Sequence, residues 1–168
     1  KAVLARAHEA SPEVHAAIGR LEGAGATTLV DAVHAVLLLT DARRGRPLVV
    51  VFSDGVDRGS WLRPDEALST ARSSDAVVHY VEIEGARTFL EPLASATGGQ
   101  GWSARHPDAL RRAFVGALEE FKSRYRLRYE PSGVPRAGWH QLEVRVVGGK
   151  GKVRARPGYL VPGGRGGR

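Results

Sequence analysis

The stretch LVVVFSDGVD, residues 48–57, places two carboxylates directly behind an apolar run. Asp54 ends the run, Gly55 follows, and Asp57 lies two residues further on. Gly and Asp are ordinary turn residues, so the strand could simply end here, or Asp54 could cap the next element. A third explanation is that an acid at the carboxyl end of a buried strand lies where open α/β sheets bind ligands. The surrounding elements must distinguish these alternatives.

The first 122 residues alternate between helical and strand patterns. Apolar spacing and start signals predict helices over 11–21, 29–43, 64–73, 87–96 and 107–121, and strands over 48–52, 76–83 and 101–103. The first two strands are apolar on successive residues, which is typical of strands covered on both faces. The alternation favours an α/β fold with a mostly parallel sheet flanked by helices.

The segment after residue 121 differs in charge and in pattern. It carries 12 basic and 2 acidic residues, a balance of +10, whereas residues 1–121 have a balance of −3. Alternating apolar residues over 124–130, 140–147 and 152–156 predict antiparallel strands, with Tyr125, Leu127 and Tyr129 on the covered side. We therefore expect an α/β domain over 1–122, a small antiparallel β extension over 123–161 and a disordered tail over 162–168.

Composition excludes several classes of protein and of site. Hydrophobic residues make up 42% of the 168, which is enough for a core. No apolar stretch approaches the roughly 20 residues that span a bilayer, and the sequence contains no signal peptide pattern. Cysteine is absent, so disulfides and thiolate metal sites are excluded.

Patterns for enzymatic chemistry are weak. GAGATT (23–28) lacks the preceding strand and the third glycine of a dinucleotide loop, and Ser53 lacks the flanking glycines of a nucleophile elbow. His34 and His79 fall within apolar segments, where core or half-buried histidines are expected, and no histidine spacing suits zinc. Asp31, in the first turn of its helix, fits a partner of the helix dipole. We predict that the protein is not an enzyme.

Two motifs taken together carry a resemblance to a known family. GATTLVDAV (25–33) and VVVFSDGVD (49–57) resemble the second and third metal-site motifs of the von Willebrand factor type A (VWA) family. The resemblance implies that Thr27 and Asp54 help to hold a divalent cation, usually magnesium, with manganese or calcium as alternatives, while Thr28 is structural. Such hard cations prefer oxygen ligands, and magnesium keeps several waters, so a partner's carboxylate can complete the coordination.

The resemblance extends along most of the chain. ARSSDAVVHYVEI (71–83) and residues 89–114 look like the family's next two helix-to-strand passages. The C-terminal part looks like the extension of a bacterial subgroup, the VWFA-related proteins abundant in acidobacteria. The resemblance implies a Rossmann-like sheet.

One motif of the family is missing. The first metal motif, Asp-x-Ser-x-Ser after the first strand, has no match before Thr27, and the first strand itself is missing. We therefore expect an N-terminally truncated fragment, and the lysine at position 1 favours this. A cation is expected only if the full-length protein carries the missing motif.

These features predict a cation-dependent, adhesion-type module of a bacterial exported or envelope protein. By the resemblance it is periplasmic, cell-surface or secreted, and its ligand is a protein that offers a carboxylate. A first alternative is a metal-independent scaffold protein of the envelope. A second is a basic module that binds anionic polymers or nucleic acid through Arg124, Arg126 and Arg128.

Overall fold

The computed structural model describes residues 25–40, 45–83, 89–133, 137–149 and 151–161, together with positions 12, 16, 19 and 20. The described helices are α2 (Leu29–Leu39), α3 (Pro64–Ser73), α4 (Leu90–Thr97) and α5 (Pro107–Lys122), and the strands are β1 (Leu48–Ser53), β2 (Val77–Glu82), β3 (Gly101–Ser103), β4 (Gly138–Gln141) and β5 (Gly158–Val161). The predicted helix over 11–21 and the predicted tail over 162–168 lie mostly or wholly outside these residues.

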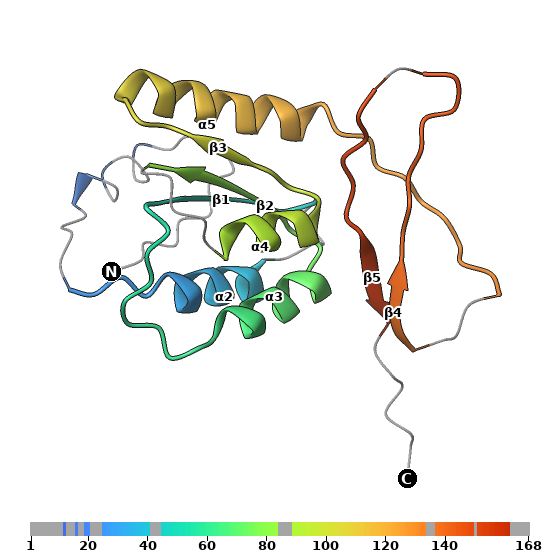
Figure 1. The fold of residues 1–168 in the computed structure, drawn as a ribbon, viewed down its shortest axis with the longest axis horizontal. Helices are drawn as coiled ribbons and strands as arrows, with labels where there is room; N and C mark the ends of the chain where they lie inside the picture. The colour runs from blue at the N-terminus through green and yellow to red at the C-terminus, as the bar shows by residue number, and fades with distance from the viewer. Residues whose placement is uncertain are drawn as a thin grey trace, which may run out of the picture.

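The central sheet is parallel and flanked by helices, which confirms the predicted α/β class. Its strand order is β1-β2-β3, and Val49 pairs with Val78 while Val81 pairs with Trp102. Helices α2, α3 and α4 lie on one side of the sheet and α5 on the other (Figure 1). Because the strands are parallel, the loops that follow them gather at one edge of the sheet, and the helices return the chain to the opposite edge.

Two apolar clusters fill the two faces of this sheet. The larger cluster joins α2, α3 and α4 to β1 and β2 and includes the buried residues Val33, Leu37, Val78 and Leu93. The smaller one, around Val81, packs under α5. The core therefore lies mainly on the side of three helices, which leaves the α5 side thinner.

The prediction that β1 is covered on both faces is wrong. Only Val49 of this strand is buried, and Phe52 is 41% exposed although its ring centroid lies 5.7 Å from that of Phe114 on α5. The reason is that β1 is an edge strand: no strand of the described part of the chain pairs with its outer side. In β2, by contrast, four of six residues are buried, as predicted.

Local signals set the helix boundaries. Pro64 and Pro107 occupy the first helical positions of α3 and α5, where a missing N–H costs nothing. The Glu66 carboxylate accepts a hydrogen bond from the Arg63 N–H at 2.8 Å, in the manner of a capping box. Helix α4 ends at Gly98, whose φ of 74° is the left-handed conformation that favours glycine.

The C-terminal part contains an antiparallel pair, but at other residues than the sequence predicts. β4 and β5 pair Trp139 with Leu160, whereas 124–130, 142–147 and 152–156 form no strand. The prediction of a covered side is also wrong, since Tyr125 is 91% exposed and Leu127 is 68% exposed. Period-two alternation produces a strand only where a partner strand supplies hydrogen bonds and another layer covers one face. Residues 124–130 have no strand partner among the described residues.

Arg156 helps to fasten the β4–β5 unit to the α/β part. Arg156 Nη2 donates hydrogen bonds to the carbonyl oxygens of Arg72 at 3.1 Å and Ser74 at 3.0 Å. These carbonyls lie at the C-terminal end of α3, where they have no partner within the helix and where the dipole favours a cation. A Cβ added at Gly98 would lie 2.7 Å from the backbone nitrogen of Arg156. The backbone of the extension therefore packs directly against this glycine.

Candidate functional site

The structure brings together the two loops that carry the predicted site residues. Thr27 lies just before α2 and Asp54 just after β1, at the carboxyl edge of the sheet. The Arg58 N–H donates to the Thr27 carbonyl oxygen at 2.9 Å, which holds the loop after β1 against the start of α2. Thr27 is exposed and Asp54 is half-buried, so both side chains are accessible from solvent.

Asp54 forms the turn at the end of β1. Its Oδ1 accepts a hydrogen bond from the Val56 N–H at 3.1 Å, while Ser53 Oγ accepts one from the Gly55 N–H at 2.9 Å. Gly55 has a φ of 78°, which explains why glycine follows the aspartate. Within the described ranges, no group donates a hydrogen bond to Oδ2 of Asp54. The turn explanation therefore holds, and it leaves one carboxylate oxygen unengaged.

The second acid, Asp57, caps a helix from outside it. Its Oδ2 accepts a hydrogen bond from the Val30 N–H at the start of α2 at 2.9 Å. Its Oδ1 accepts from the N–H groups of Gly59 at 3.2 Å and Ser60 at 3.0 Å. Partial burial opposes ionisation, yet the hydrogen bonds from Ser60, Val30 and Gly59 lower the pKa of Asp57 to about 2. Both oxygens of the Asp57 carboxylate therefore already accept hydrogen bonds, one of them from the start of α2.

A third acid, Asp31, fastens the same loop from the helix side. Its carboxylate accepts hydrogen bonds from the N–H groups of Trp61 at 3.0 Å and Leu62 at 2.9 Å. In return, the Asp31 N–H donates to Ser60 Oγ at 3.1 Å. Asp31 lies in the first turn of α2 as predicted, but its main contacts are with a loop about 30 residues away. The sequence did not reveal either cross-link, since both depend on tertiary contact.

These bonds present an aromatic side chain beside the predicted site. Trp61 is 95% exposed, although its backbone is held by Asp31. Tryptophan is enriched at binding surfaces. Its large ring buries much apolar area when a partner binds, and ordering its two side-chain torsions costs little conformational entropy. The sequence analysis did not single out Trp61.

The donors at this edge fit a hard cation but form only part of a site. Thr27 offers a hydroxyl and Asp54 offers one unengaged carboxylate oxygen, and both are oxygen ligands of the kind that magnesium prefers. No group of three or more His, Asp or Glu side chains able to hold a metal occurs in the described part of the chain. Since magnesium takes six ligands, waters and further protein groups would have to supply the rest.

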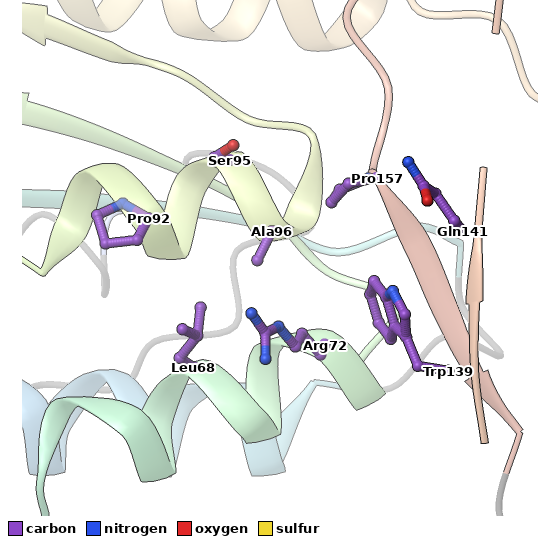
Figure 2. Close-up of a pocket in the computed structure, with 8 residues that line it drawn as sticks. All are labelled: Leu68, Arg72, Pro92, Ser95, Ala96, Trp139, Gln141 and Pro157. Carbon is purple, nitrogen blue, oxygen red and sulfur yellow. The ribbon is translucent and has the colours of Figure 1, made fainter. Parts of the chain in front are cut away.

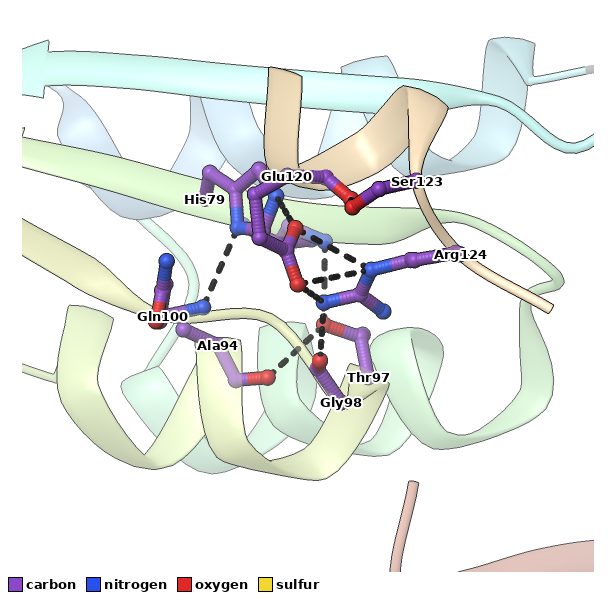
Figure 3. Close-up of polar contacts among 9 residues, drawn as sticks. His79, Ala94, Thr97, Gly98, Gln100, Glu120, Ser123 and Arg124 are labelled. Carbon is purple, nitrogen blue, oxygen red and sulfur yellow. Dashed lines mark hydrogen bonds and ion pairs between the residues drawn. The ribbon is translucent and has the colours of Figure 1, made fainter. Parts of the chain in front are cut away.

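A different polar cluster lies on the α5 face of the sheet, near its amino edge (Figure 3). His79 of β2 is fully buried; its Nδ1 accepts a hydrogen bond from the Gln100 N–H at 3.1 Å, and its Nε2 lies 2.8 Å from Glu120 Oε2. Arg124 donates through Nε and Nη2 to Glu120 Oε1 at 3.0 Å and 2.6 Å. Arg124 Nη2 also donates to the Gly98 carbonyl oxygen at 2.6 Å. The cluster thus ties β2, α4 and α5 together.

The protonation states follow from this geometry. Because a backbone N–H donates to Nδ1 of His79, the proton of the neutral ring lies on Nε2, facing Glu120. Burial lowers the pKa of His79 despite the carboxylate, so the ring is neutral at neutral pH. Burial alone would raise the pKa of Glu120, but the hydrogen bonds and charge of Arg124 lower it overall. His79 therefore links β2 to the Gln100 backbone and to Glu120 of α5 as a neutral ring.

The structure also tests the predicted histidine environments and the predicted arginine row. His79 is buried, and His34 is half-buried with Nδ1 lying 3.0 Å from Thr70 Oγ1, so the expectation for both is confirmed. Arg124 is engaged by Glu120 and Gly98. It therefore does not join Arg126 and Arg128 in a free row along a strand.

Comparisons with known proteins add little to these observations. No protein-family model matches the chain, and no curated protein matches it. A crystal structure of an uncharacterized membrane-spanning protein from Vibrio fischeri matches 46% of this chain at 26% identity and a TM-score of 0.39. The match covers 49% of that protein, so the chain spans about half its length. In the described residues of this chain, none of the helices has the length and apolar character needed to cross a membrane.

Proposed function

We propose that the chain belongs to a VWA-type, Rossmann-like domain that binds a protein partner through a divalent cation at the carboxyl edge of β1. The observation that carries the proposal is the contrast among three neighbouring acids. Both carboxylate oxygens of Asp31 and of Asp57 accept hydrogen bonds from backbone N–H groups. Asp54 Oδ2, beside the Thr27 loop, accepts none from the described residues.

The outer edge of β1, which no described strand pairs with, supports the same proposal. A further parallel strand could pair with the outer side of β1, next to Phe52 and the incompletely covered ring of Phe114. A strand that ended in Asp-x-Ser-x-Ser would deliver an acid and two hydroxyls to the same edge as Asp54, because parallel strands end together. In such a domain Asp54 would supply charge and Thr27 a hydroxyl, and a partner's carboxylate would take an open position.

Trp61 gives this surface a second means of contact. A partner carboxylate at the cation would lie on the edge that also presents Trp61, and interface energy concentrates in such aromatic anchors. The module would act in an exported or envelope protein of a bacterium, as the resemblance implies. The cation alone would give weak affinity, so the aromatic contact would supply much of the binding energy.

The test uses the full-length protein and manganese as a spectroscopic substitute for magnesium. Mn²⁺ binding, measured by electron paramagnetic resonance with Mg²⁺ as competitor, should weaken about tenfold or more in Asp54→Ala, because a direct charged ligand is lost. Asp65→Ala, which removes an exposed acid from the start of α3, serves as the control. Equal Mn²⁺ affinity of Asp54→Ala and wild type would contradict the site.

Trp61→Ala separates cation binding from partner binding. The wild-type full-length protein, immobilised on a resin, should retain partner proteins in magnesium and release them when a chelator is added. Trp61→Ala should no longer retain these partners, while its affinity for Mn²⁺ should stay unchanged.

The alternative function is a metal-independent scaffold, which the hydrogen bonding of Asp31 and Asp57 to backbone N–H groups favours. Retention of the same partners in the presence of chelator would support that alternative.

A further inference from the structure

The structure contains a groove at the opposite end of the molecule from Asp54. It lies between α3, α4 and β4 and has a volume of about 530 Å³. Its lining includes Leu68 and Arg72 from α3, Pro92 and Ala96 from α4, and Trp139 and Gln141 from β4 (Figure 2). The groove lies where the extension docks on the C-terminal end of α3 through Arg156.

The charged group of the groove is Arg72. Its guanidinium carbon lies 5.6 Å from the centroid of the Trp139 ring, and the side chain leans toward the space between α3 and α4 (Figure 2). Stacking on an aromatic ring positions a guanidinium without neutralising it. Arg72 forms no ion pair with a carboxylate of the described residues. The groove therefore carries a positive charge, on the exposed side chain of Arg72, that has no acidic partner among the described residues.

The remaining walls of the groove are largely apolar. Leu68, Pro92 and Ala96 line one side, and Trp139, which is 43% exposed, forms the other. Gln141 is exposed at the rim and offers an amide that can both donate and accept hydrogen bonds. Arginine and tryptophan are the side chains most enriched where binding energy concentrates in protein interfaces.

We propose that this groove binds an extended segment of a partner protein in which an aspartate or glutamate is flanked by apolar residues. The carboxylate would pair with Arg72, whose planar fork matches it in a bidentate manner. The flanking side chains would cover Trp139 and Leu68, and the peptide backbone would hydrogen-bond to Gln141. One guanidinium between apolar walls does not suit nucleic acid, which is bound through several phosphate contacts.

This binding does not depend on the cation-dependent function proposed above. Arg72 lies at the C-terminal end of α3, and that end of the helix is remote from the carboxyl edge where Asp54 lies. Chelator and Asp54→Ala should therefore leave peptide binding unchanged. Failure of one proposal would not affect the other.

The experiment selects peptides from a random heptapeptide library on the immobilised chain. Selected peptides should contain an acid beside apolar residues, and their affinity should be measured by fluorescence anisotropy. In Arg72→Gln the affinity should fall about tenfold or more, because a charge-assisted hydrogen bond is lost. The same loss should follow when the acid of the peptide is replaced by its amide. Arg111→Gln on α5 removes the same charge elsewhere and should bind as wild type does.

A second variant guards against a folding defect. Arg72→Lys keeps the charge but loses the bidentate fork, and its affinity should lie between those of Arg72→Gln and wild type. The proposal is overturned if no acidic, apolar motif is enriched, or if the selected peptides bind Arg72→Gln as tightly as wild type. Displacement of the peptides by a short single-stranded oligonucleotide would assign the groove to nucleic acid and would likewise overturn it.

Discussion

The two edges of the parallel sheet use opposite charges for the same structural task. At the carboxyl edge, Asp57 caps the start of α2. At the amino edge, Arg124 and Arg156 bind carbonyls at the ends of α4 and α3. Acids at helix N-termini and bases at helix C-termini both complement the helix dipole. The comparison shows that acids close helix starts at one edge and arginines close helix ends at the other.

The two edges differ in how deeply their polar groups are buried and in which charged groups have no partner. The amino edge contains the fully buried His79, and its partner Glu120 and the neighbouring Arg124 are only partly exposed. The carboxyl edge is shallow, and its acids lie on a half-exposed loop. Of the charged groups described above, Asp54 Oδ2 at the first edge and the Arg72 guanidinium near the second accept or form no hydrogen bond or ion pair with a side chain of the described residues. These two groups are the ones to which we assign binding.

The largest effect is expected at the buried edge. Glu120→Ala leaves His79 Nε2 and the Arg124 guanidinium without their carboxylate and should lower the free energy of unfolding by about 2–3 kcal/mol. Urea denaturation followed by circular dichroism measures this difference. Glu119→Ala, on the exposed neighbour, should change stability by less than about 0.5 kcal/mol. A similar small change in both variants would contradict the role of the cluster.

The next effect concerns the docking of the extension. Arg156→Ala removes the hydrogen bonds to the carbonyls of Arg72 and Ser74 and should cost about 2 kcal/mol. Hydrogen exchange measured by mass spectrometry should show loss of protection in β4 and β5 before any loss in β2. Arg154→Ala, on an exposed neighbour, should leave exchange unchanged. Uniform loss of protection across both parts would show instead that they unfold as one unit.

The smallest effect is expected at the shallow edge, and it depends on pH. Asp57→Asn keeps an acceptor at the start of α2 but loses the charge, and should cost about 1 kcal/mol at neutral pH. The folded pKa of about 2 lies below the ordinary value of 3.8. The stabilisation by the ionised group is therefore complete above about pH 4 and is lost as the pH falls through about 2.

Urea denaturation of wild type and Asp57→Asn at several pH values between about 2 and 7 measures this dependence. The difference in stability should narrow as the pH falls from about 4 to about 2, because Asp57 takes up a proton in the unfolded chain over this range while the folded carboxylate stays ionised until about pH 2. A difference that stays constant down to about pH 2 would show that the charge of Asp57 contributes nothing. In that case the acid at the carboxyl edge would not stabilise a helix end through its charge, as the arginines at the amino edge do.

Local sequence signals predicted the α/β part well. Proline at the first position fixed the starts of α3 and α5, and β3 occupies the predicted residues 101–103. These signals depend on a few neighbouring residues, so tertiary context does not alter them. The β extension was predicted poorly, because alternation over 124–130 says nothing about whether a partner strand is present.

The sequence by itself determined the α/β class of the fold and the starts of α3 and α5, whereas for Asp54 it left a turn, a cap and a ligand site open. Only the tertiary structure decided which charges are engaged. Asp57 meets the start of α2 across 27 residues, and Arg156 meets the end of α3 across 82 residues. The physical reason is that hydrogen bonds to helix ends depend on distance in space, whereas sequence patterns record only neighbours along the chain.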